Sequence, residues 1–209
     1  MWDEGSIVFW FEHFRPSKHV GVDIQTRNDS EYFRRYVASR GLARKIKTYW
    51  EVDQTDSGRL RDIVRSEFPG LLDLVIDDAS HLYEPTRRSF ETLFPLLRPG
   101  GLYVIEDWAW GHWREFQTPS HLWAKEIPLT RLIAELIEAT GSESGVTTGG
   151  FIGSVNVFQG FAVVERGELD QAAHAPFDLE NLIRRLMVAP PGRHERLSRI
   201  QQFVRQLTG

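Results

Sequence analysis

Apolar and polar positions follow two different spacings along the first half of the chain. Apolar residues recur there at helical spacing within residues 7–14, 30–40, 60–64 and 84–97, and they do so again in the second half at residues 129–137. Short segments between them have the pattern of buried strands, at residues 20–24, 46–52, 72–76 and 102–105. Strands that are apolar throughout and separated by helices are typical of a parallel sheet covered on both faces. The pattern therefore predicts an α/β fold with a doubly wound, mostly parallel sheet.

The pattern changes after Asp107. Three tryptophans follow within a stretch that lacks regular spacing, and two short apolar segments then flank Gln159-Gly160, which predicts a C-terminal antiparallel hairpin. From Gly167 onward the chain is more polar, and helices are expected at residues 179–187 and 195–207. We therefore expect an α/β domain over residues 1–166 and a helical appendage over residues 167–209.

Composition narrows the class of protein. With 41% hydrophobic residues, the chain has enough apolar material for a packed core. Its formal charge of −4 argues against a nucleic-acid binder that works through phosphate contacts. The absence of cysteine excludes disulfides, cysteine nucleophiles and thiolate metal sites. No apolar run approaches the roughly twenty residues of a membrane span, so we expect a soluble, cytoplasmic protein.

Acidic residues lie at the carboxyl ends of four predicted strands. They are Asp23, Asp53, the pair Asp77 and Asp78, and the pair Glu106 and Asp107. In open α/β sheets, ligands bind at the carboxyl ends of the strands. A single carboxylate there often caps the next helix, but adjacent carboxylates repel each other and need a cation or a raised pKa. The two pairs together therefore suggest a hard divalent cation, Mg²⁺ first, with Mn²⁺ or Ca²⁺ as alternatives.

His81 follows Asp78 by three residues, at the mouth of the predicted acidic cluster. A single histidine is usually an ordinary polar residue, but a neutral imidazole beside a metal site is well placed as a general base. Two interpretations of the tryptophan-rich stretch also stay open. Trp108, Trp110 and Trp113 either cover the core or stack on the apolar face of a sugar or polyketide.

Five segments carry a family resemblance, in the family's order. They are Gly5-Ser6 and residues 20–24, 53–56, 77–81 and 98–107. Together they resemble class I S-adenosylmethionine (SAM) dependent O-methyltransferases that act on sugars of natural products. This family includes the macrocin, mycinamicin and rhamnosyl O-methyltransferases, with relatives described as cephalosporin hydroxylases. The resemblance implies a Rossmann-like fold and methyl transfer to a hydroxyl of a glycosylated small molecule.

The resemblance also implies roles for individual residues. His81 corresponds to the catalytic base. The implied Mg²⁺ ligands are Asp78, Glu106 and Asp107. The implied SAM-binding residues are Ser6, Asp23, Asp53, Gln54, Thr55 and Asp77. Implied partners are a glycosylated small-molecule acceptor and further copies of the chain in a homo-oligomer, with neither nucleic acid nor membrane.

One departure from the family keeps other functions open. The family normally has a strand with an acidic, glycine-rich turn before the Gly5-Ser6 pair, so we expect the first strand of the usual fold to be missing. A truncated, non-catalytic methyltransferase-like domain that does not bind SAM is therefore one alternative. A non-haem iron hydroxylase is another, with His81, one of the acids and His112 as conceivable ligands.

Overall fold

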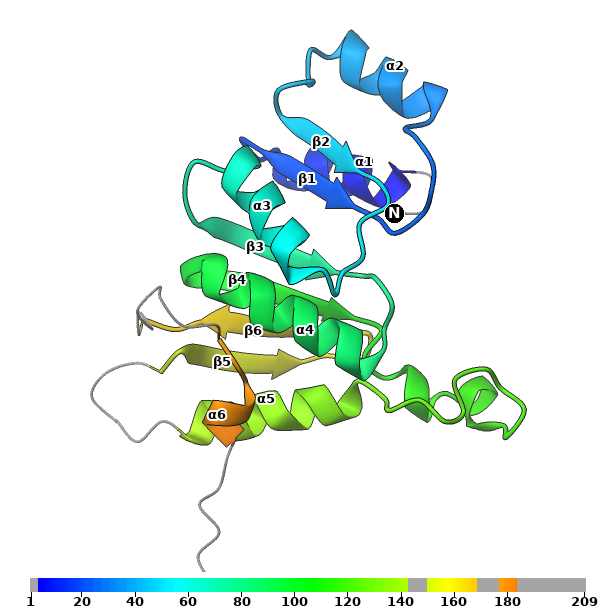
Figure 1. Cartoon of the computed structure of the whole chain (residues 1–209), viewed down its shortest axis with the longest axis vertical. Coiled ribbons are helices and arrows are strands. Elements are labelled where there is room, and N and C mark those ends of the chain that lie inside the picture. The colour runs from blue at the N-terminus through cyan, green and yellow to red at the C-terminus, as the bar shows by residue number, and fades with distance from the viewer. Residues whose placement is uncertain (1–3, 143–149, 169–176, 184–209) are drawn as a thin grey trace, which may run out of the picture.

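The structure, a computed structural model, describes residues 4–142, 150–168 and 177–183. Figure 1 shows the strands following one another across the molecule, with helices against them. The strands are β1 (His19–Val22), β2 (Ile46–Tyr49), β3 (Leu72–Asp77), β4 (Leu97–Glu106), β5 (Ile152–Val157) and β6 (Phe161–Arg166). The helices are α1 (Gly5–Phe14), α2 (Glu31–Ser39), α3 (Ser57–Glu67), α4 (Tyr83–Leu93), α5 (Thr130–Ser142) and α6 (Glu180–Ile183). Short 3₁₀ turns are η2 (Phe94–Leu96), η3 (Trp110–His112) and η4 (Arg114–Gln117).

The strand pairing confirms the α/β class. β1 pairs with β2 and β3 pairs with β4, both in parallel, and a helix connects the members of each pair. β6 runs antiparallel to both β4 and β5. The predicted C-terminal hairpin is therefore confirmed, with Val157 opposite Ala162. The helix expected at residues 195–207 lies outside the described residues.

Backbone hydrogen bonds divide the described strands into two sheets. One contains β1 and β2, and the other has the order β3-β4-β6-β5. β1 and β3 are the neighbouring strands of the two sheets in Figure 1, but they belong to separate hydrogen-bonded groups. Side chains connect the two sheets, because buried Leu60 and Ile63 of α3 form one cluster with Val20, Val22 and Leu93.

Local backbone chemistry explains where the predicted elements begin and end. The Ser30 hydroxyl accepts a hydrogen bond from the Phe33 N–H at 3.1 Å and caps α2. The predicted strand over residues 46–52 ends early, at Tyr49, because Glu51 adopts a left-handed backbone with φ of 58°. The helix predicted to reach Leu97 stops at Leu93, and Pro95 lies in the 3₁₀ turn that follows.

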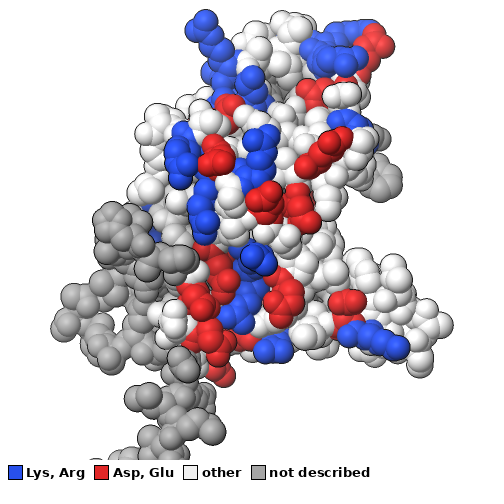
Figure 2. Space-filling view, viewed as in Figure 1, with Lys and Arg blue, Asp and Glu red and all other residues white. Residues whose placement is uncertain are grey.

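The main core lies between the four-stranded sheet and helices α4 and α5. Fully buried Phe90, Phe94 and Tyr103 belong to it, and so do Phe177 and Leu179 from beyond the predicted domain boundary. The domain division at residue 166 stays a prediction. No helix in the described part of the chain has the length and apolarity that crossing a bilayer requires. Figure 2 shows positive and negative side chains interspersed on one face.

Candidate active site

The parallel pairing of β3 and β4 creates the edge where the predicted acidic residues meet. Asp77 lies opposite Ile105 in the register of the two strands. Asp78 and Glu106 therefore follow at the same edge, as the carboxyl ends of parallel strands do. Asp107 comes directly after β4, and its N–H donates to the carbonyl oxygen of Gly160 at 2.8 Å.

Three predicted site residues form a compact group at this edge. One ligand atom each from Asp78, His81 and Asp107 lies within 4.8 Å of the other two. The Nε2 atom of His81 is 3.6 Å from Oδ1 of Asp78. The Asp78 side chain is 50% exposed and that of His81 is 19% exposed, so the group is open to a ligand from solvent.

The charges at this edge suit a divalent cation. Burial raises the pKa of Asp78, the His81 ring lowers it, and the charge of Asp107 raises it again. Burial also raises the pKa of Glu106, and the charges of Asp78 and Asp107 add to that effect. A cation among these carboxylates would stabilise their ionised forms, and oxygen-rich ligand sets fit Mg²⁺.

The predicted ligand set and the observed group overlap without being identical. The structure brings Asp78 and Asp107 together, and it places His81, the predicted base, in the same group. Glu106, the third predicted ligand, is outside this group, although its carboxylate is near enough for its pKa to respond to the other charges. Residues Asp78, His81 and Asp107 can hold a metal ion through two carboxylates and an imidazole. The assignment of ligands and base stays a prediction.

Two of these residues have an unusual backbone conformation. His81 has φ of 56° and Asp107 has φ of 49°, in the left-handed region that non-glycine residues seldom adopt. The indole N–H of Trp110 donates to the carbonyl oxygen of His81 at 2.6 Å. Backbone strain of this kind persists where surrounding contacts hold it, and it concentrates at functional sites.

Asp77 lies in a different environment from Asp78. Its side chain is 8% exposed, and Oδ2 accepts hydrogen bonds from Ser89 at 2.5 Å and from Tyr103 at 2.7 Å. Burial raises the pKa of Asp77, and these two hydrogen bonds lower it. Successive residues of a strand point to opposite faces, so the two neighbouring acids are separated. A cofactor contact for Asp77 stays a prediction.

The other predicted cofactor residues occupy the ends of β1 and β2 and the start of α1. Asp23 Oδ1 accepts the Gln25 N–H at 2.9 Å. Asp53 Oδ1 accepts both the N–H and the hydroxyl of Thr55, at 2.7 and 2.8 Å, and these bonds lower the pKa of Asp53. These are local turn contacts and not helix caps, because Ser30 caps α2 and Asp56 caps α3.

Gln54 and Ser6 complete the predicted cofactor set. Gln54 Oε1 accepts the backbone N–H of Ser80 at 3.0 Å, which joins the segment after β2 to the segment after β3. Ser6 lies in the first turn of α1 and is half-buried. The cofactor roles of the whole set stay predictions.

Some contributors to this region were not among the predicted site residues. Ser89 and Tyr103 hold Asp77, and Phe116 and Trp123 pack against Trp110 at ring-centroid distances of 5.6 and 5.0 Å. Phe116 and Trp123 lie in a stretch without regular spacing, so only its high aromatic content could have indicated them. His112, the conceivable third iron ligand, pairs with Thr130 at 2.7 Å and is outside the three-residue group.

Known proteins that are similar to this chain include two O-methyltransferases. Demethylmacrocin O-methyltransferase of Streptomyces fradiae is 30% identical over 175 residues, which cover 79% of this chain and 40% of that protein. Mycinamicin VI 2''-O-methyltransferase of Micromonospora griseorubida is 30% identical over 195 residues, covering 88% of this chain and 45% of that protein. This chain thus spans less than half the length of these relatives.

A solved structure and a family model agree with these relatives. The structure of MycE methyltransferase from the mycinamycin biosynthetic pathway, in complex with Mg, SAH and mycinamycin VI, superposes with a TM-score of 0.56. It is 31% identical, and the match covers 82% of this chain and 42% of that one. The model of the methyltransferase domain matches residues 5–108, which contain Asp23, the three-residue group and the α/β elements that position them. The chain therefore belongs to the methyltransferase domain family.

Proposed function

We propose that this protein is a Mg²⁺- and SAM-dependent O-methyltransferase that methylates a sugar hydroxyl of a glycosylated small molecule. The observation that carries the proposal is the group formed by Asp78, His81 and Asp107 at the carboxyl edge of β3 and β4. A relative of the same family has a structure in complex with Mg, SAH and a macrolide, which supports this choice of cofactor and acceptor.

The residues of the group have complementary tasks in this proposal. When bound, SAM supplies the methyl group, and Mg²⁺ supplies positive charge that favours an ionised acceptor hydroxyl. Asp78 and Asp107 hold the cation, with the charge of Glu106 adding to the attraction. The Nε2 atom of His81 accepts the proton from the acceptor hydroxyl, because a neutral imidazole is a suitable base near neutral pH.

SAM binding would involve the neighbouring strand ends. Asp23 would accept hydrogen bonds from the ribose hydroxyls. It directly follows β1, and the carboxyl ends of β1 and β3 lie on the same side of the molecule in Figure 1. Asp53, Gln54 and Thr55 would lie around the adenosine, and Asp77 would lie towards the cofactor side. Ser6, in the first turn of α1, would be a further cofactor contact. Positioning the acceptor hydroxyl against the methyl donor would supply much of the rate enhancement.

A direct assay tests this function. The chain is incubated with SAM, MgCl₂ and mycinamycin VI, and SAH formation is measured together with the mass of the acceptor. Isothermal titration measures SAM and SAH binding separately. We expect SAM binding and Mg²⁺-dependent gain of one methyl group.

The same experiment separates the alternatives. Absence of both SAM and SAH binding would contradict the proposal and favour a non-catalytic domain. Turnover that EDTA abolishes and that Fe²⁺ with 2-oxoglutarate restores, but Mg²⁺ does not, would indicate the iron hydroxylase instead.

A further inference from the structure

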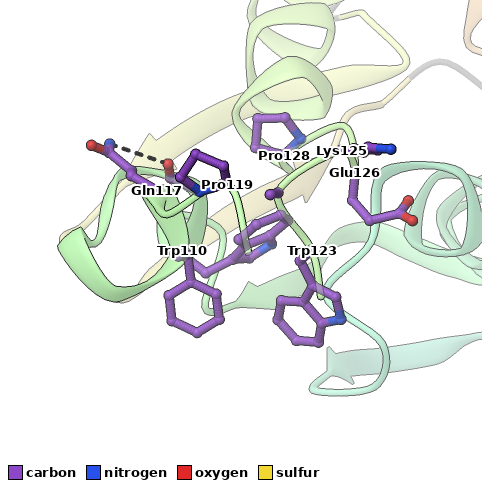
Figure 3. A pocket seen from close by; sticks show the side chains of 10 residues that line it. Trp110, Gln117, Pro119, Trp123, Lys125, Glu126 and Pro128 are labelled. Atoms are coloured by element: carbon purple, nitrogen blue, oxygen red, sulfur yellow. Dashed lines mark hydrogen bonds between the residues drawn. The ribbon is translucent and has the colours of Figure 1, made fainter. Parts of the chain in front are cut away.

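An aromatic pocket lies beside the candidate active site, in the segment between β4 and α5. Its volume is about 530 Å³, within the range of small-molecule sites. The lining includes the aromatic residues Trp110, Phe116 and Trp123 and the prolines Pro119 and Pro128. Figure 3 shows the two tryptophan side chains close together in the pocket wall.

The pocket wall is a packed structure. Phe116 and Trp123 are stacked at 5.5 Å between ring centroids, and Trp110 meets Trp123 edge to face at 5.0 Å. Gly111 lies so close to Pro128 that an added Cβ atom would be 2.6 Å from the proline ring. The absence of a side chain at Gly111 therefore lets η3 approach the start of α5 and shape the pocket.

Trp110 joins this pocket to the proposed catalytic group. It is 3% exposed, its indole N–H donates to the His81 carbonyl oxygen at 2.6 Å, and its backbone N–H contacts the carbonyl oxygen of Asp107 at 3.3 Å. One tryptophan side chain thus separates the pocket from the residues proposed to hold the reacting hydroxyl. The pocket and the proposed catalytic group are therefore neighbours, joined by the contacts of Trp110.

The pocket's chemistry selects an apolar occupant. Aromatic faces and proline rings offer stacking surface, and the lining charges are confined to Lys125 and Glu126, both exposed. In Figure 2 the segment that projects between β4 and α5 is mainly uncharged on the visible face. Such a surface favours an apolar ring system over a charged or strongly polar ligand.

From this geometry we infer that the aromatic pocket binds the apolar aglycone of the acceptor while the attached sugar reaches His81. The inference rests on the proposed function. It adds which part of the acceptor binds at the metal-binding edge and which part binds in the pocket. The reacting sugar lies at the metal-binding edge, and the ring system that carries the sugar stacks on Phe116 and Trp123.

Binding of an aglycone that lacks the sugar tests this inference without requiring turnover. The probe is the macrolactone aglycone of mycinamycin VI, titrated into the full chain with SAH and MgCl₂ present, and followed by calorimetry. Trp123→Ala removes stacking surface, and Ala124→Trp fills the pocket from an exposed position that leaves the packing intact. Leu122→Ala is the control, since Leu122 is an exposed apolar residue of the same segment outside the pocket lining.

We expect the wild type and Leu122→Ala to bind the aglycone equally. Trp123→Ala should bind it about threefold to tenfold more weakly, the loss of one aromatic contact, and Ala124→Trp should weaken binding at least as much. SAH binding should be the same in all four proteins. Equal aglycone affinity in all four, or no binding to the wild type, would overturn the inference, whereas loss of SAH binding by the wild type would instead contradict the proposed function.

Discussion

The indole nitrogen of Trp110 lies 2.6 Å from the carbonyl oxygen of His81. This hydrogen bond connects the wall of the aromatic pocket to the left-handed backbone of the proposed base. We therefore expect Trp110 to be a positioning residue that acts through His81, the proposed base.

Replacing Trp110 with phenylalanine removes this donor and keeps an aromatic ring in the pocket wall. We expect Trp110→Phe to lower kcat about tenfold, the cost of one lost buried hydrogen bond, with a smaller change in acceptor KM. Trp108→Phe is the control, since its indole donates at 2.8 Å to Phe158, away from His81. A rise in KM with unchanged kcat would show that Trp110 only binds the acceptor.

The proposed base itself is tested by His81→Ala. Loss of a general base lowers kcat by about 10²- to 10⁴-fold, and SAM affinity should stay the same because the cofactor residues are elsewhere. Steady-state kinetics and isothermal titration with SAM measure the two effects. His112→Ala serves as control, because His112 pairs with Thr130 outside the three-residue group. An equal loss of SAM affinity in His81→Ala would mean that His81 has been given the wrong role.

Metal binding is expected to depend on Asp78. Asp78→Asn replaces a charged ligand with a neutral amide and should weaken Mg²⁺ affinity about tenfold or more, with activity falling in parallel. Mg²⁺ titrations of EDTA-treated protein measure the affinity. Asp73→Asn, on the strand that precedes Asp78, is the control, since Asp73 is exposed and pairs with Arg98. Unchanged Mg²⁺ affinity in Asp78→Asn would remove Asp78 from the ligand set.

Tyr103→Phe tests how much the hydrogen bond from Tyr103 to buried Asp77 contributes to stability. Tyr103 is fully buried, and its hydroxyl donates to Asp77 at 2.7 Å. Removing it leaves a buried carboxylate with one donor fewer, which costs about 1–3 kcal/mol in the free energy of unfolding. Urea unfolding checks this value against Tyr32→Phe, whose side chain is exposed. A change below the error of the method would mean that water replaces the lost donor.

The free energy of unfolding should decrease at acid pH, because Glu67 then becomes protonated. Hydrogen bonds from Lys18 and Tyr49 lower the pKa of Glu67 despite its partial burial. A carboxyl whose pKa is lowered on folding stabilises the protein above its unfolded pKa, and this stability is lost as the pH falls through its folded pKa. We expect wild type to lose more free energy of unfolding between neutral and strongly acid pH than Glu67→Gln does. Glu31→Gln, at an exposed pair, should follow wild type.

Much of the fold could be predicted because apolar spacing reflects which face of each element is buried. The β5–β6 hairpin and the helices α1, α2 and α5 follow directly from that spacing. The early end of β2 could not be predicted, because it depends on the left-handed backbone at Glu51, and most residue types give no signal for that conformation.

The candidate site could be predicted only where the order of the strands along the chain fixes the positions of its residues. Strand ends of a parallel sheet must share an edge, so Asp78 and Asp107 could be placed together from their positions after two strands. Successive residues of a strand also point to opposite faces, which accounts for the different surroundings of Asp77 and Asp78. The contact between Trp110 and Trp123 arises from a chain path without periodicity, so the pocket required the three-dimensional structure.

The division of the strands into two hydrogen-bonded sheets has a consequence for amide hydrogen exchange. Each sheet can open without breaking a backbone ladder of the other, so the two are expected to lose amide protection with different free energies. Asp23 directly follows β1 of one sheet, and Asp77 is the last residue of β3 in the other. A SAM molecule that contacts both ends would stabilise both against opening, and the two exchange phases would then merge into one cooperative transition.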